Sequence, residues 1–436
     1  MGDTILHRGN LAERERHSTR DSGVLRSRWT LLEHAAFWGI VSQFAVFFLG
    51  LEPLAPLLTA GPVILIGAAG LFRRRTVPHW LAILWLASMI GVLMQMLAVF
   101  GLRGIGGWYL PGWLLTFALA AFLPLAGAMV RPEIVFYASA ILGIQALIYS
   151  VVAGMAVSAG LDPSYNSPIP VTRLIDSSFH VVRLIQPIGI AGGERRLLAF
   201  TPFPTSAGAV ACIFALLSLC HRRSWTKGIA MAGWLLLLLL TGARTGIICA
   251  ALGIPFYFLL LLPRRYLFLG AGAALILATA LTGPILRAAD LGYGMLREQR
   301  SASSHDRANL RRLAMDGWRY GGNSVMGAGV SVPGGPIVHN VGIGTHDFVG
   351  ANLFIRGALG FGLTLLPVMV TLIFGFFAGF TPAERIGTTI AVVLLAYTYS
   401  QELQTLYVHI WPIFLVVGAM GIRRRGASLE PVLAKI

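Results

Sequence analysis

The side chains that could do chemistry gather in one polar stretch, from about residue 286 to residue 360. It stands out because the chain around it is largely apolar. Loops longer than about fifteen residues without structure of their own are usually functional or disordered. The arginines and histidines that precede its last apolar run are Arg287, Arg297, Arg300, Arg307, Arg311, Arg312, Arg319, His305, His339 and His346. Arginines suit an anionic substrate and histidines suit a proton transfer, so we take this stretch as the candidate site.

The amino-acid composition indicates whether the chain belongs in water or in a membrane. Hydrophobic residues make up 56% of the 436 residues, charged residues make up 12%, and the mean hydropathy is +0.74. A water-soluble globule of this length needs more polar surface, so the sequence predicts an integral membrane protein. The net charge of +16 falls in short arginine clusters between apolar runs, which is typical of cytoplasmic loops and argues against a nucleic-acid partner.

Apolar runs long enough to cross a bilayer recur along the chain. A span needs about 20 mostly apolar residues. The candidate spans are residues 31–50, 53–72, 79–100, 109–130, 133–160, 204–220, 229–241, 245–262, 267–285, 351–379, 386–402 and 407–421. We therefore expect an all-α polytopic membrane protein of about twelve transmembrane helices. Residues 31–425 would form one transmembrane domain, preceded by a disordered basic tail (1–30) and followed by a short tail (426–436).

The short connections predict the orientation of these spans. Every second one is basic, and the intervening short ones carry little beyond Arg103 and Arg244. The basic connections contain Arg73, Arg74, Arg75, Arg131, Arg222, Arg223, Lys227, Arg264, Arg265, Arg385, Arg423, Arg424 and Arg425. Cytoplasmic loops are rich in Lys and Arg, so both termini are expected in the cytoplasm. Residues 161–203 and 286–350 would then be long loops on the outer side.

The three cysteines point to no redox or metal chemistry. Cys212, Cys220 and Cys249 all lie inside apolar runs, where each is expected to be a small core hydrophobe. Their spacing matches neither a disulfide framework nor a zinc site. We expect no cofactor and no metal.

The first outer loop has two basic features. Apolar and polar side chains of residues 171–185 recur at helical spacing, which predicts a helix lying in the membrane interface. Further on, Arg195 and Arg196 stand just before a span. Two interpretations of these arginines stay open, namely anchoring to anionic headgroups and binding of an anionic substrate.

The sequence TGARTG, residues 241–246, places Arg244 between two apolar runs. The runs predict a tight outer turn at membrane depth. A charged side chain near a helix centre costs roughly 2.5 to 3.5 kcal/mol on insertion scales, so something should offset it. An arginine beside a helix N-terminus suits a phosphate or pyrophosphate oxygen. The alternative is an arginine that reaches to lipid phosphate.

The second outer loop is expected to hold one helix and one irregular segment. Residues 305–321 read as the helix, with Ser303 or Ser304 as its cap. Its apolar stripe would consist of Leu310, Leu313, Ala314 and Trp318. We expect Arg307, Arg311 and Asp316 to flank this stripe or to face away from it. The glycine-rich residues 321–336 predict irregular backbone that leads to His339 and His346.

Three patterns follow one another between residues 190 and 365. The first is TGARTG, and the second is Arg307 followed by DGW and VMGAGV. The third is His346 followed by Gly357 and Gly360. Taken in this order, they resemble the Ser/Thr-Gly-x-Arg turn, the Arg-to-Gly-x-Gly stretch and the His-Asn pattern with Gly-x-x-Gly of the bacterial O-antigen ligase and O-antigen polymerase superfamily.

Two departures from that family pattern concern residues next to the matched ones. Asp347 stands where the family has asparagine, and Arg356 rather than a glutamate precedes Gly357. The resemblance does not extend to the N-terminal half of the chain, which matches only in being hydrophobic.

The resemblance implies a GT-C-like membrane glycosyltransferase of the bacterial inner membrane, with a large periplasmic loop between the ninth and tenth spans. Its donor would be a glycan on undecaprenyl pyrophosphate, and its acceptor a hydroxyl of another glycan or of lipid A-core. His346 would be the base, and Arg244 and Arg307 would bind the pyrophosphate without a metal. Further substrate-binding candidates are Arg195, Arg196, Arg311, Arg312, His339 and Asp347. Among these His339 is the rival base.

Two other classes of function also fit a chain of this kind. A polysaccharide or lipid transporter, such as a flippase, should carry charges near the membrane midplane and paired repeats. No repeat is found, and Glu52 and Glu402 lie near span ends, where we expect them to be solvated or paired. The third class is a scaffold of a polysaccharide assembly machine, and the absence of a large soluble domain argues against it.

Overall fold

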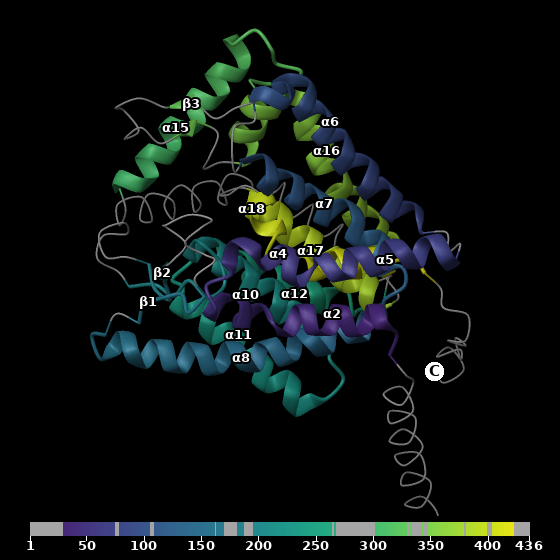
Figure 1. The fold of residues 1–436 in the computed structure, drawn as a ribbon, viewed down its shortest axis with the longest axis vertical. Helices are drawn as coiled ribbons and strands as arrows, with labels where there is room; N and C mark the ends of the chain where they lie inside the picture. The colour runs from purple at the N-terminus through teal and green to yellow at the C-terminus, as the bar shows by residue number, and fades with distance from the viewer. Residues whose placement is uncertain are drawn as a thin grey trace, which may run out of the picture.

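The computed structural model shows a mostly helical chain (Figure 1). It describes residues 29–74, 78–104, 109–161, 163–169, 181–186, 195–263, 266, 301–328, 332–333, 342–343, 348–378, 381–398 and 403–422. Within them, three helices are long and apolar enough to cross a membrane, over Trp80–Val99, Pro132–Ser158 and Val349–Ala378. Shorter apolar helices pack beside them. The chain thus has the make-up of an all-α membrane protein, as its composition predicts.

Apart from the helix of the second outer loop, the helices lie in or overlap the predicted apolar runs, but the runs at 31–50 and 53–72 are each divided into more than one helix. They are α2 (Leu31–Val41), α3 (Gln43–Phe48), η1 (Glu52–Leu54), α4 (Ala55–Thr59), α5 (Gly61–Arg74), α6 (Trp80–Gly104), α7 (Tyr109–Gly127), α8 (Pro132–Ser158), α10 (Pro204–Leu219), α11 (Ser224–Leu240), α12 (Arg244–Leu259), α15 (Ser301–Tyr320), α16 (Phe348–Ala378), α17 (Pro382–Thr398), α18 (Leu403–Tyr407) and α19 (Pro412–Ala419). Every predicted run among the described residues contains a helix, and the run at 267–285 lies outside them.

One end of the helical body carries basic side chains from connections far apart in sequence. Arg131, just before α8, pairs with Glu33 in the first turn of α2, with Nε and Oε1 2.6 Å apart. Cys220, after α10, lies within electrostatic reach of Lys227 and Arg385. We call this the basic end. It collects connections that the charge pattern assigns to the cytoplasm.

The opposite end joins segments that the charge pattern assigns to the outer side. The hydrogen bonds that join them are Ser167 Oγ to Leu49 O (2.7 Å), Leu197 N to Leu240 O (3.3 Å) and Gln95 Nε2 to Met326 O (2.5 Å). In Figure 1, the strands β1 (Tyr165–Asn166) and β2 (Val181–Val182) lie on the left side of the view near the left end of α8, and α15 lies at the upper left. The described contacts therefore sort the connections into the same two groups as the charge pattern.

The predicted interfacial helix over residues 171–185 is wrong in its last part. Val181–Val182 forms β2 and pairs antiparallel with Tyr165–Asn166, and Ile185 forms an isolated bridge with Leu197. Valine has two heavy substituents on Cβ and packs well in a strand, so a partner strand overrides the helical spacing. Residues 171–180 lie outside the described part of the chain.

The predicted helix of the second outer loop is confirmed, with a different start. α15 begins at Ser301, so Ser303 and Ser304 lie inside it and do not cap it. Leu310 and Ala314 are buried, whereas Arg311 and Asp316 are exposed, which is the predicted arrangement of its faces. The segment after α15 is not entirely irregular, because β3 (Val332–Pro333) pairs antiparallel with β4 (Gly342–Ile343).

Candidate active site

Arg196 lies in an extended segment that runs beside the end of α11. The Gln186 N–H donates to its carbonyl oxygen at 2.8 Å, and the next residue, Leu197, donates to the Leu240 carbonyl at 3.3 Å. The Arg196 side chain is only 7% exposed. A Cβ placed on Gly242 would lie 3.5 Å from the Nε of Arg196. The guanidinium group is thus buried against the turn that follows α11.

That turn is the one predicted from TGARTG. α11 ends at Leu240, α12 begins at Arg244, and Gly242 between them has φ +55, a conformation that glycine adopts without strain. The Thr241 hydroxyl donates to Leu238 O at 2.7 Å, inside α11. Ala243 is the N-cap of α12 and makes no side-chain capping hydrogen bond. The N-cap residue of α12 therefore offers no side-chain oxygen to the N–H groups of the first turn.

A close helix contact fixes the start of α12. A Cβ on Gly246 would lie 2.6 Å from the backbone carbon of Gly208 in α10, and a Cβ on Gly208 would overlap the Ala243 side chain. Small residues let two membrane helices approach backbone to backbone. α10 and α12 therefore meet closely at the start of α12, next to Arg244. Arg244 itself is half-buried.

Tyr149 of α8 holds the segment that follows Arg196. Its hydroxyl donates to Leu184 O at 2.9 Å and accepts from the Ala199 N–H at 3.2 Å. Ala199 has φ +52, which an L-residue with a side chain adopts only when its surroundings impose it. The strained turn redirects the chain just after Arg196. We call Arg196, Arg244 and residues 241–243 the arginine site.

Arg195 points elsewhere. Its Nη1 donates to Val157 O at 3.3 Å, in the last turn of α8. Successive side chains of an extended segment point to opposite sides, so Arg195 and Arg196 cannot share one ligand. A cation at a helix C-terminus interacts favourably with the last carbonyl groups. The structure therefore gives Arg195 a helix-capping role and separates it from Arg196.

The remaining arginine candidates lie on α15. Arg311 and Arg312 are exposed, and Arg312 Nε stands 3.8 Å from Asp316 Oδ2 in an exposed pair. Arg307 belongs to the same helix. α15 packs mainly on α16 and β4, so these residues are not joined to the arginine site by the main contacts of their helix. His339, His346 and Asp347 lie outside the described residues.

The glycine pair of the third pattern has a structural role in α16. Gly357 interrupts that helix with φ 62 and ψ −174, and the turn at residues 323–328 fills the break. The N–H of Ala328 donates to Phe354 O at 2.7 Å, and the N–H of Ala358 donates to Ser324 O at 2.9 Å. The second and third sequence patterns thus meet in space. A break at membrane depth is tolerated because other backbone groups satisfy the freed ones.

Arg356, beside this break, is a buried charge that the sequence reasoning did not select. It is 2% exposed, its Nη1 donates to Asn352 Oδ1, and its guanidinium carbon lies 5.4 Å from the centre of the Phe117 ring. Gln95 of α6 donates to the Arg356 carbonyl at 2.9 Å. A lone arginine and a lone glutamine inside predicted spans are the signals that could have pointed here, because polar groups are costly in a bilayer.

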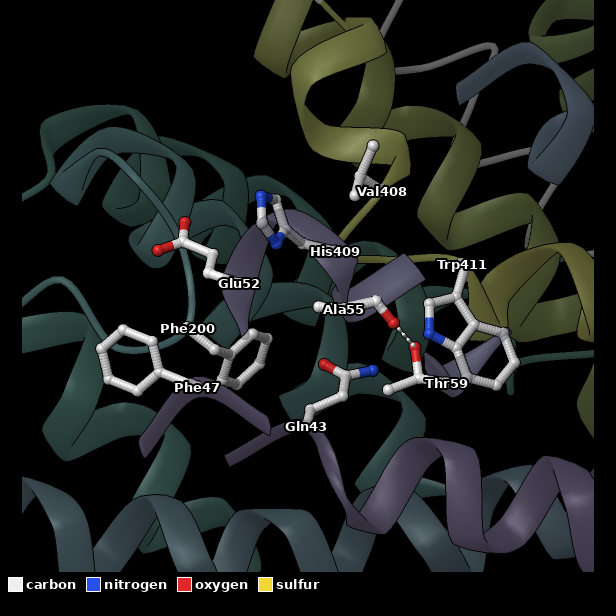
Figure 2. A pocket seen from close by; sticks show the side chains of 9 residues that line it. All are labelled: Gln43, Phe47, Glu52, Ala55, Thr59, Phe200, Val408, His409 and Trp411. Carbon is white, nitrogen blue, oxygen red and sulfur yellow. Dashed lines mark hydrogen bonds between the residues drawn. The ribbon is translucent and has the colours of Figure 1, made fainter. Parts of the chain in front are cut away.

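Glu52 lies in a second polar region, at the same end of the molecule as the arginine site. It lines a cavity with His409, and Figure 2 shows both side chains among those that surround this cavity, which include Gln43 and Trp411. Burial raises the pKa of the Glu52 carboxyl to about 7.

No protein-family model matches the chain, and no curated protein is significantly similar to it.

Proposed function

We propose that this chain is a GT-C-like glycosyltransferase of the bacterial inner membrane, with about twelve spans and both termini in the cytoplasm. It would move a glycan from undecaprenyl pyrophosphate to an acceptor hydroxyl on the periplasmic side, as an O-antigen ligase or a polysaccharide polymerase does. Residues 161–203 and 286–350 would be its periplasmic loops. No metal takes part in the proposed reaction.

The observation that carries the proposal is the buried guanidinium group of Arg196 at the start of α12. It lies against Gly242, two residues before Arg244, at a helix N-terminus without a side-chain cap. Burying an arginine at membrane depth is costly, so an anionic ligand would offset part of that cost. A pyrophosphate has oxygens for two guanidinium groups and for the N–H groups of a first helical turn.

The two ends of the helical body support the topology. Leu197 in the first long loop is hydrogen-bonded to Leu240 at the α11–α12 turn. Basic connections gather at the other end, around Arg131 and around Lys227 with Arg385. Basic loops stay in the cytoplasm, so the arginine site would face the periplasm. That is the side on which a lipid-linked glycan would be used.

The proposed reaction needs two contributions from the protein, stabilisation of the leaving group and removal of a proton. The acceptor oxygen attacks the anomeric carbon of the donor, the bond from that carbon to the pyrophosphate oxygen breaks, and undecaprenyl pyrophosphate leaves. Arg196 and Arg244, with Arg307 as a further candidate, would stabilise the negative charge that develops on the leaving group. His346 would take the proton of the acceptor hydroxyl, as a general base does.

Lysine variants of the arginine site test the proposal. Arg196→Lys and Arg244→Lys keep the positive charge but lose the planar fork that binds two oxygens at once. We expect purified protein with either change to transfer little glycan from an undecaprenyl-pyrophosphate-linked donor. Arg195→Lys and Arg312→Lys are matched controls and should keep wild-type transfer. Wild-type activity in both site variants would refute the pyrophosphate assignment and favour lipid anchoring.

Two alanine variants test the base in the same assay. General-base assistance is worth about a hundredfold to ten-thousandfold in rate, so His346→Ala should lose detectable transfer and keep donor binding. His339→Ala should do less, because its distance to Gly357 and Gly360 does not match the family pattern. An inactive His339→Ala beside an active His346→Ala would reverse the two roles. Absence of transfer by the wild-type protein with any lipid-linked donor would refute the enzyme class.

A further inference from the structure

A cavity of about 20 Å³ lies among α3, η1, α4 and the turn between α18 and α19 (Figure 2). Its polar lining side chains are those of Gln43, Glu52, Thr59, His409 and Trp411, and the rings of Phe47 and Phe200 form part of its wall. A water molecule needs roughly 10 to 15 Å³ in a comparable measure, so the cavity has room for one group of that size.

Two of the lining side chains have polar atoms with no partner. Gln43 is 6% exposed, and neither its Nε2 nor its Oε1 makes a hydrogen bond. Trp411 is 1% exposed, and its indole Nε1 makes none either. Buried polar groups in folded proteins are nearly always hydrogen-bonded, and an unsatisfied one costs about 1 to 3 kcal/mol. These orphaned atoms on one cavity point to a bound hydrogen-bonding group.

The chemistry of the lining selects the class of that group. The N–H groups of Gln43 and Trp411 are donors and disfavour a metal cation, whereas the Glu52 carboxyl disfavours an anion. Gln43 Oε1 needs a donor. A hydroxyl group accepts from an N–H and donates to an oxygen, and it is neutral. The aromatic side chains of Phe47 and Phe200 offer apolar surface to the carbon atoms of a ligand that carries such a hydroxyl group.

We propose that this cavity is a carbohydrate-hydroxyl subsite, which holds water when no glycan is bound. Its position supports this assignment, which rests on the proposed function. Phe200 is four residues beyond Arg196 on the same segment. The two Cα atoms are therefore no more than about 14 Å apart, and the turn at Ala199 shortens that path. A sugar at the pyrophosphate end of a donor could reach both places.

Hydroxyl-radical footprinting of the purified full-length protein tests the subsite without a donor. Brief X-ray irradiation in ¹⁸O-labelled water generates radicals from bound water as well as bulk water. Trp411 is almost fully buried, so it should gain ¹⁸O only if water occupies the cavity. Tyr320, which is 82% exposed, is the reference for bulk labelling. Gln43→Leu should lower Trp411 labelling several-fold relative to Tyr320, and Gln145→Leu, outside the cavity, should not.

Glucose and N-acetylglucosamine, added separately, identify the carbohydrate. At least one sugar should reduce the ratio of Trp411 to Tyr320 labelling in the wild-type protein by about half or more. An unlabelled Trp411 in the wild-type protein means a dry cavity and overturns the subsite. Labelling that neither sugar reduces means a structural water only and also overturns it. Since the experiment uses neither lipid-linked donor nor turnover, its result is independent of the transfer assay.

Discussion

Replacing Gly357 by alanine should destabilise the protein far more than a glycine substitution a turn away. Gly357 has φ 62 and ψ −174, a region that residues with a side chain hardly populate. A Cβ there would overlap the Val325 carbonyl oxygen and lie 2.6 Å from the Gly327 N. Neither neighbour can move without displacing the turn at residues 323–328 that fills the break in α16.

Two terms give the size of the effect. Holding alanine in that backbone conformation costs on the order of 1 to 3 kcal/mol. Displacing the turn would break the hydrogen bonds from Ala328 to Phe354 O, from Ala358 to Ser324 O and from Leu359 to Val325 O, each worth roughly 0.5 to 1.5 kcal/mol. We therefore expect Gly357→Ala to lower the free energy of unfolding by roughly 3 to 7 kcal/mol.

The matched control is Gly362→Ala in the same helix. A Cβ on Gly362 meets no atom within 4 Å, so alanine should be neutral or stabilise the helix by roughly 0.5 to 1 kcal/mol. A thermal ramp with a thiol-reactive fluorophore is a suitable assay, because Cys212 and Cys249 are free and buried and react only after unfolding. Equal unfolding midpoints for the two alanine variants would refute the structural role of Gly357.

The remaining predictions use the same thermal assay. Tyr149→Phe removes the hydroxyl that is hydrogen-bonded to two backbone segments, and it should lower the free energy of unfolding by about 1 to 3 kcal/mol. An unchanged unfolding midpoint would refute this stabilising role of the hydroxyl. Arg131→Met strands the buried carboxylate of Glu33 and should cost about 3 kcal/mol, whereas Arg312→Met, which removes an exposed pair, should change little. Burial raises the pKa of Glu52 from 4.5 to about 7, so the folded protein binds this proton more tightly than the unfolded chain. Stability from this group should thus be fully present below about pH 4.5, decline as the pH rises to about 7, and change no further above that pH. Glu52→Gln should abolish that decline, and an identical pH profile in the variant would contradict it.

Local patterns in the sequence were enough to predict most helices and one turn. A run of apolar residues must satisfy its own backbone in a bilayer, and a helix is the element that does so within one segment. The α11–α12 turn followed from Arg244 between two short runs, and the exposed and buried faces of α15 followed from side-chain spacing. Each of these depends on residues within a few turns of one another.

Contacts between distant segments could not be predicted in this way. The pairing of Val182 with Tyr165 replaced a predicted helix, because a strand needs a partner that local spacing does not reveal. The break in α16 is stable only because a turn about thirty residues earlier in the chain supplies its hydrogen bonds.

The candidate site likewise combines features that the sequence predicts with features that depend on the tertiary structure. The sequence by itself determined which side chains are chemically suited to an anion, and it treated Arg195 and Arg196 alike. Only the tertiary structure assigned one to the end of α8 and the other to the start of α12, because an extended segment between two helices turns neighbouring side chains to opposite sides. The cavity of Gln43 and Trp411 likewise exists only in three dimensions, since its polar atoms come from segments hundreds of residues apart and neither carries a charge that would mark it in the sequence.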